Sequence, residues 1–203
     1  MKRCVNVRGV LGRVAVLIAM GGVASAGGCA PMRSDAYTPQ TEERRDPAAS
    51  ERIGREAAAE IESDPALAES MLREALGLDL YNGPAHNNLG VLYLKQGKLY
   101  EAAGEFEWAR KLMPGHPDPR MNLALTLEKA GRLDEALTTY RTALEVYPRH
   151  IESMQALSRL QVRTGKRDDA TRGMLEEIAL RGTSEKWREW ARRVMVKGKG
   201  MGT

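Results

Sequence analysis

The stretch "NNLGVLYLKQGKLYEAAGEFEWARKLMP", residues 87–114, is followed 34 residues later by "MNLALTLEKAGRLDEALTTYRTALEVYP", residues 121–148. The two stretches align without a gap. The same period extends beyond both, with alanine at Ala68, Ala102, Ala136 and Ala170 and glycine at Gly97, Gly131 and Gly165. Self-similarity at a fixed period of this length predicts an array of stacked repeats.

Each copy contains two apolar patterns separated by a glycine turn. The first places apolar residues at i, i+3 and i+4, and the second places small and aromatic residues at i, i+4 and i+7, so both predict amphipathic helices. Proline then ends the second helix, because it cannot continue the hydrogen-bond ladder. The residues at these repeat positions are Leu89, Gly90, Tyr93, Ala102, Phe106, Ala109 and Pro114, and in the next copy Leu123, Ala136, Tyr140, Ala143 and Pro148.

This pattern resembles the tetratricopeptide repeat (TPR), a helix–turn–helix unit of 34 residues. The resemblance implies an all-α fold, a right-handed α-solenoid of about four TPR helix pairs. We expect the array over residues 50–182, with units at about 49–82, 83–116, 117–150 and 151–182. One helix pair cannot bury both of its faces, so neighbouring units must stack. The first helix is expected at about 51–62, and Asp64 with Pro65 is predicted to begin the second.

A further helix is predicted at residues 183–196, where "SEKWREWARRVM" places Trp187, Trp190, Ala191 and Val194 on one stripe. We interpret it as a capping helix that covers the fourth unit. The alternative is a helix that binds a membrane surface or a partner, because seven Lys/Arg face two Glu between residues 181 and 199. Residues 197–203 are expected to be a disordered tail.

The N-terminal region is predicted to be a targeting segment. Residues 1–28 carry four basic and no acidic residues around an apolar run, Val14 to Ala26, that is too short to span a bilayer. The ending "ASAGGCA" resembles a bacterial lipoprotein signal, which implies a lipid on Cys29 as the first mature residue. Ordinary cleavage after Ala26 and an uncleaved anchor remain alternatives. Residues 29–49 lack an apolar period and are predicted to be a flexible tether.

The lipoprotein reading places the protein in the bacterial cell envelope, anchored to the outer membrane and facing the periplasm. A soluble periplasmic or secreted protein is the alternative. The chain of 203 residues has a formal net charge of +4, but removal of residues 1–28 leaves 27 Lys/Arg against 27 Asp/Glu. A near-neutral mature chain lacks the charge excess that nucleic-acid binding requires, so no nucleic-acid partner is expected.

The sequence predicts neither an enzyme nor a metal or cofactor site. It contains no phosphate-binding loop, nucleophile elbow or paired metal-ligand motif. Both cysteines, Cys4 and Cys29, lie outside the repeats. His116 and His150 occupy equivalent repeat positions, and His86 stands where a bulky residue is usual, so we interpret all three as structural.

The resemblance implies that the first helix of each unit lines a concave groove, and it supplies the candidate binding residues. The alternative is that some of these residues only pack between units. The groove is expected to be apolar at its centre and polar at its rim, which suits a peptide or helix of another protein. Its residues are Asn87, Val91, Leu94 and Lys95, then Met121, Leu125 and Glu128, then Gln155 and Arg159.

From these features we predict an envelope adaptor or scaffold that binds a protein partner, possible assemblies being a pilus or an outer-membrane machine. Two alternatives belong to other classes. One is a structural spacer between the outer membrane and the cell wall. The other is a periplasmic enzyme, which the absence of a converging acid–base or nucleophile set disfavours.

Overall fold

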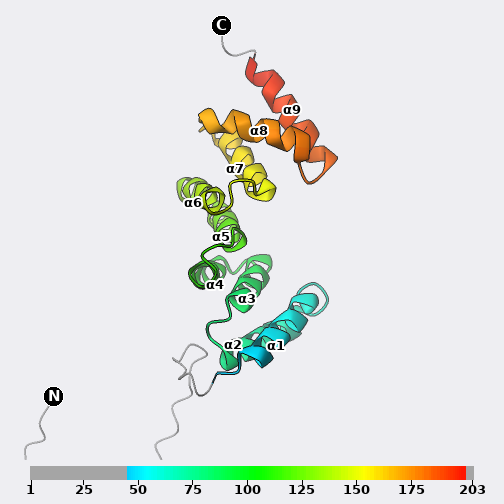
Figure 1. The fold of residues 1–203 in the computed structure, drawn as a ribbon, viewed down its shortest axis with the longest axis vertical. Helices are drawn as coiled ribbons and strands as arrows, with labels where there is room; N and C mark the ends of the chain where they lie inside the picture. The colour runs from blue at the N-terminus through cyan, green and yellow to red at the C-terminus, as the bar shows by residue number, and fades with distance from the viewer. Residues whose placement is uncertain (1–44, 200–203) are drawn as a thin grey trace, which may run out of the picture. The chain divides into compact units, whose positions relative to one another are not determined.

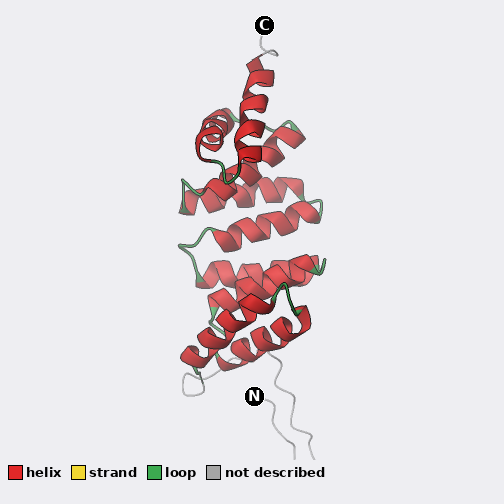
Figure 2. Cartoon of the chain, turned by 90° about the vertical axis from the view of Figure 1, so that its right-hand side faces the viewer, coloured by secondary structure: helices red, strands yellow, loops and turns green. Residues whose placement is uncertain are grey.

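The computed structural model describes residues 45–199, which form nine α-helices and no strand (Figures 1 and 2). The predicted signal peptide, Cys29 and most of the predicted tether lie outside the described residues. The helices are α1 (Pro47–Glu60), α2 (Pro65–Leu78), α3 (Gly83–Lys95), α4 (Leu99–Leu112), α5 (Asp118–Lys129), α6 (Leu133–Val146), α7 (Ile151–Thr164), α8 (Asp169–Arg181) and α9 (Glu185–Lys199).

Each helix packs mainly on its neighbours in the sequence, so the pairs α1–α2, α3–α4, α5–α6 and α7–α8 follow one another along the array (Figure 2). The turn inside three of these pairs contains a glycine with positive φ, at Gly97, Gly131 and Gly165. Glycine adopts this conformation without the steric cost that a β-carbon brings. The glycine turns predicted from the 34-residue period are therefore confirmed.

The periodic residues form one continuous hydrophobic core. Ala68, Ala102 and Ala136 are fully buried, as are the rings of Phe106 and Tyr140. A single cluster of buried side chains extends from Ile53 in α1 to Met174 in α8. The predicted all-α solenoid of stacked helix pairs is confirmed, because no pair has a core separate from that of its neighbours.

Capped starts define the first three helices. The side chains of Asp46, Asp64 and Asn82 each accept a hydrogen bond from a backbone N–H of the first turn, and a proline stands at the start of each helix. The Asp64–Pro65 start was predicted and is confirmed. These bonds satisfy amide groups that have no partner inside the helix.

The array begins earlier than the sequence suggested. The tether was predicted to extend to residue 49 and the first helix to begin near residue 51, but α1 begins at Pro47. Arg45 donates two hydrogen bonds, of 2.9 and 3.2 Å, to the buried carboxylate of Asp79. The backbone N–H of Asp46 donates to the carbonyl of Leu78 at 3.0 Å. Residues 45–49 therefore belong to the folded array.

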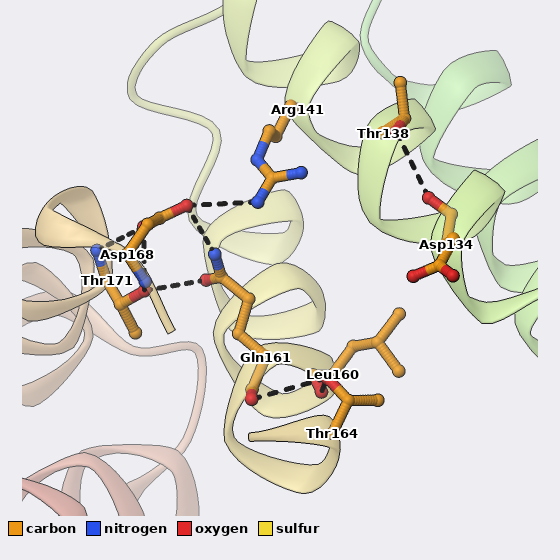
Figure 3. Close-up of polar contacts among 8 residues, drawn as sticks. All are labelled: Asp134, Thr138, Arg141, Leu160, Gln161, Thr164, Asp168 and Thr171. Carbon is orange, nitrogen blue, oxygen red and sulfur yellow. Dashed lines mark hydrogen bonds and ion pairs between the residues drawn. The ribbon is translucent and has the colours of Figure 1, made fainter. Parts of the chain in front are cut away.

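The fourth unit departs from the register of the others. Gln161 stands where Tyr93 and Leu127 stand in the preceding units, and it is fully buried. Its amide donates to Asp168 at 2.8 Å and its carbonyl accepts from the Thr171 hydroxyl at 3.1 Å, as Figure 3 shows. A buried side-chain amide requires such hydrogen-bond partners, whereas the side chain of a leucine and the ring of a tyrosine do not.

This network shifts the start of α8, the second helix of the fourth unit. Asp168 and Thr171 form a capping box, so α8 begins at Asp169. The corresponding helices α4 and α6 begin at Leu99 and Leu133, and the 34-residue period would place the start of α8 at Arg167. As a result Thr171 is buried and Ala170 is exposed. Ala170 therefore shares the 34-residue spacing of Ala68, Ala102 and Ala136 but not their buried position.

The last helix packs on the fourth unit. Ala191 is fully buried against Leu175 and Ile178 of α8, and the half-buried Trp187 and Trp190 pack on the same cluster. The two indole rings lie 5.3 Å apart, edge to face. The α9 helix extends to residue 199, three residues beyond its predicted end. No helix in the described part of the chain is long and apolar enough to cross a membrane.

Candidate protein-binding surface

The predicted groove residues come from three first helices, α3, α5 and α7, which lie in successive helix pairs. We call their exposed and half-buried members the first-helix surface. Its residues are Asn87, Val91, Leu94, Lys95, Met121, Leu125 and Arg159.

An amide pair joins α3 to α5 at this surface. The side-chain N–H of Asn122 donates to the side-chain oxygen of Asn87 at 3.1 Å. Both residues are half-buried. The bond fixes the amide of Asn87, whose own N–H groups have no other hydrogen bond within residues 45–199. An amide held in this way is preorganised to donate to the backbone of an incoming peptide.

A charged cluster joins α5 to α7. Arg159 and Arg163 approach the carboxylate of Glu128 at 2.8 and 3.0 Å, and the Tyr140 hydroxyl donates to it at 3.2 Å. Only 9% of Glu128 is exposed, whereas both arginines stay partly exposed. Burial, with the Glu128 charge added, raises the pKa of Tyr140 far above its ordinary value. Tyr140 therefore stays a neutral donor.

Glu128 does not line a surface as predicted. Its position in the repeat would place it on the first-helix surface, but two guanidinium groups and a phenol enclose its carboxylate. Its role is to hold α5 and α7 together and to orient Arg159. Sequence reasoning missed this because the partners lie 31 and 35 residues away and do not recur with the repeat.

Gln155 is also buried rather than available to a partner, with 3% of its surface exposed. Its side-chain oxygen accepts a hydrogen bond from the Thr183 hydroxyl at 3.1 Å, in the connection between α8 and α9. The α8–α9 connection folds over this position and removes it from the predicted groove. The groove prediction therefore does not hold for Gln155 in the geometry of the fourth unit.

The remaining residues give the first-helix surface an apolar centre. Val91, Leu94 and Met121 are half-buried and contact the core, and Leu125 is half-buried beside them. Lys95 lies at the edge, nearly half exposed, with its ammonium 2.6 Å from a carboxylate oxygen of Glu62. Apolar side chains flanked by cations suit a peptide that carries both apolar and acidic residues.

A buried contact between a histidine and a glutamate, His86 and Glu105, was not anticipated from the sequence. His86 is fully buried and its Nδ1 lies 2.6 Å from a carboxylate oxygen of Glu105, while its Nε2 lies 3.0 Å from the carbonyl oxygen of Leu80. Its ring also stacks on Trp108, with centroids 5.6 Å apart. The pair ties the connection before α3 to α4. No group of three or more His, Cys, Asp or Glu residues in the described chain is arranged to hold a metal ion.

Two cavities lie outside the first-helix surface and both border Asp168. One, of about 490 Å³, is lined by residues of α8 and α9 and is open to solvent on one side, and the other, of about 260 Å³, lies between α6 and α8. Burial raises the pKa of Asp168, but hydrogen bonds from Thr171 and Arg141 outweigh it and hold the pKa below its ordinary value. Sequence reasoning gave no indication of either cavity.

A comparison with protein families matches residues 58–117 and 87–156 to the tetratricopeptide repeat. The overlapping matches cover α2 to α6 and the first part of α7, up to residue 156. The chain belongs to the tetratricopeptide repeat family. Tetratricopeptide repeats are generally scaffolds for protein–protein interaction. A comparison with curated proteins found no match.

Solved structures of other tetratricopeptide repeat proteins have the same fold. A repeat protein from Parabacteroides merdae is 21% identical with a TM-score of 0.62, over 75% of this chain and 60% of the other. PilF of Pseudomonas aeruginosa is 21% identical with a TM-score of 0.61, over 69% and 64%. The first repeat domain of Spaghetti (RPAP3), solved with a bound HSP90 peptide, is 16% identical with a TM-score of 0.57, over 60% and 98%. At these sequence identities the similarity shows a shared fold.

Proposed function

We propose that this tetratricopeptide repeat protein is a non-enzymatic adaptor whose first-helix surface binds a peptide or helix of a partner protein. The observation that carries the proposal is the half-buried apolar row of Val91, Leu94 and Leu125, bordered by Lys95 and Arg159. The Asn87–Asn122 and Glu128–Arg159 contacts hold the three helices in fixed register. A preorganised surface loses less conformational entropy when it binds.

The partner chemistry follows from the surface. Apolar side chains at the centre favour a segment with apolar anchors, and the two cations favour carboxylates beside them. That the similar Spaghetti (RPAP3) domain was solved with a bound peptide supports a peptide ligand in this fold.

The cellular setting is part of the proposal. Cys29 is lipid-modified and anchors the protein to the outer membrane facing the periplasm, where it serves the assembly of a pilus or an outer-membrane machine. The support is the basic, apolar and small-residue order of residues 1–28 followed by that cysteine. Labelling of cells with a radioactive fatty acid tests the anchor: the wild type takes up label, and Cys29→Ser does not. A wild-type protein without label contradicts it.

The binding proposal is tested by in-cell crosslinking and recovery of the tagged protein. The test variant is Val91→Glu with Leu125→Glu, and its helix content is checked by circular dichroism. The control is Tyr100→Glu with Tyr147→Glu, which adds the same charge at two exposed positions outside the first helices.

We expect a discrete partner with the wild type and the control, and its loss with the test variant. Recovery of the same proteins with all three rejects the first-helix surface as the binding site. A spacer that has no dedicated ligand would give that second result.

A further inference from the structure

The cavity between α8 and α9 has the chemistry of a docking site. Its floor is apolar, formed by Leu175 and by residues of the last turns of α9. Its lining also carries three guanidinium groups, those of Arg167, Arg172 and Arg192, against two carboxylates, those of Asp168 and Glu176. Arg172 and Arg192 lie 3.1 and 3.2 Å from carboxylate oxygens of Glu176 and Glu185, whereas Arg167 is exposed and has no ion pair within residues 45–199.

The cavity is open because α9 continues the register of the first helices without a second helix to cover it. Ala191 lies 34 residues after Leu157 and, like Leu157, is buried. In α3 the next residue, Gly90, faces the ring of Phe106 in the second helix of its pair. The corresponding residue of α9 is Arg192, which is exposed and borders the cavity. Among the described residues, no helix covers this side of α9.

The two ends of the array carry opposite charge. Residues 45–82 contain nine acidic and four basic residues, a net charge of −5, whereas residues 183–199 contain six basic and two acidic residues, a net charge of +4. The first segment includes α1 and α2 and the last includes α9, which lie at opposite ends of the series of packed helices (Figure 1). The units between them are close to neutral.

The acidic end also exposes an apolar side chain. Leu67 in the first turn of α2 is 46% exposed. Asp64 and Glu74, three residues before and seven after it, are both exposed and so place carboxylates on the same side of the helix. Glu74 has no ion pair in the described part of the chain. An apolar residue between carboxylates complements an apolar floor between guanidinium groups.

We infer that the α8–α9 cavity receives the first helix pair of a second copy of this chain. Leu67 of one copy enters the apolar floor, and the carboxylates around it face Arg167, Arg172 and Arg192 of the other. The contact joins different surfaces of the two copies, so the pair keeps one free acidic end on one copy and one free basic end on the other. Such a head-to-tail contact adds further copies and produces linear chains.

The association is measured by sedimentation velocity on residues 34–203, which contain both core clusters in full. We expect the mean mass to rise over about a hundredfold range of protein concentration. It should fall when salt increases from about 0.05 to about 0.5 M, because the shorter Debye length screens the opposite charges. A monomer at every concentration and in low salt overturns the inference.

Two exposed substitutions test which surfaces meet. Leu67→Asp disables the acidic end, and Val196→Asp, at a residue that is 72% exposed, disables the cavity. Each variant alone should stay monomeric, with association weakened at least about tenfold. Mixed together they should form one-to-one dimers and nothing larger, because each retains one intact end. Tyr100→Asp, at a side chain that is 91% exposed, should associate as the wild type does.

The result separates this inference from the proposed function. The Val91→Glu with Leu125→Glu variant should self-associate normally, because its substitutions leave both ends unchanged. A mixture of the two end variants that stays monomeric overturns the inference. The inference is also overturned if the wild type is monomeric but binds a different protein, and the Val196→Asp variant no longer binds that protein. That result would assign the cavity to the other protein.

Discussion

Gly90 of α3 lies directly against the ring of Phe106 in α4: a β-carbon at Gly90 would lie 2.7 Å from the Cε1 atom of the ring. Real β-carbons do not approach so closely, and the Phe106 ring is fully buried and enclosed by core side chains. The missing side chain therefore sets the distance between the two helices of the second unit. Ala124 and Ser158 take the equivalent place in the next two units.

Gly90→Ala should destabilise the array, although alanine is the better helix former. Overpacking of a full core costs about 1–3 kcal/mol, and alanine regains about 1 kcal/mol of helix propensity. We expect a net loss of about 1 kcal/mol in the free energy of unfolding, measured by urea titration with circular dichroism.

Gly104→Ala is the matched control for this substitution, because it lies in α4 and no atom is within 4 Å of its added β-carbon. It should raise the free energy of unfolding by about 0.5–1 kcal/mol. Equal effects of the two substitutions would show that the Phe106 contact does not constrain the helices.

Glu128→Gln should weaken the junction of the third and fourth units. An amide keeps the shape of the carboxylate, but it accepts at one atom only and turns an N–H group toward Arg159 or Arg163. Loss of charged hydrogen bonds at this buried residue should cost about 2 kcal/mol of unfolding free energy. Urea unfolding measures the loss, and Glu145→Gln, at an exposed residue of α6, should change stability by less than about 0.5 kcal/mol. A Glu128→Gln protein as stable as this control would contradict a structural role for the cluster.

The sequence was sufficient to predict the core because the core is periodic. Ala102, Phe106 and Ala109 recur with a fixed spacing, and helix packing demands small and large residues at those places. The positions that the sequence did not predict depend on contacts between side chains that do not recur with that period. Ala170 follows the alanine register, but the hydrogen bonds of Gln161 and Asp168 set the helix start.

The candidate site was predicted less completely for the same reason. The register places Val91 and Leu94 on one side of α3, where both are half-buried, because their exposure follows from helix geometry alone. Glu128 and Gln155 share that register but are buried by Arg163 and Thr183, whose positions depend on the folded geometry of the last unit. To predict the cavity beside α9, one must likewise know which helix faces remain uncovered in the folded protein.

The buried His86–Glu105 contact should behave as a coupled pair. His86→Phe removes the imidazole and leaves the Glu105 carboxylate in a site that is almost closed to water, which should cost about 3 kcal/mol. Glu105→Leu should cost a similar amount, because it removes the carboxylate partner of the buried imidazole. The double variant replaces both polar groups by apolar ones and should cost about 1–2 kcal/mol less than the sum. Urea unfolding of the four proteins measures this coupling, and strictly additive losses would show that the contact contributes nothing.

Asp168→Asn should destabilise the protein in a pH-dependent way. Asparagine can still cap α8, but its NH₂ group cannot accept the hydrogen bonds that one carboxylate oxygen receives from Arg141 and Gln161. Because the ion pair is partly exposed, we expect a loss of about 1 kcal/mol at neutral pH.

The sign of the pH dependence follows from the lowered pKa of Asp168. Its ordinary value is 3.8 and its folded value is lower, so the carboxylate stabilises the protein fully above pH 3.8. The contribution is lost as pH falls through the folded pKa. Urea midpoints of the wild type and Asp168→Asn should therefore differ at neutral pH and converge as the pH drops below 3.8. Asp169→Asn, at the exposed neighbouring residue, should show little difference at either pH. A gap between wild type and Asp168→Asn that stays constant into acid would assign the loss to packing or capping instead of to the charge.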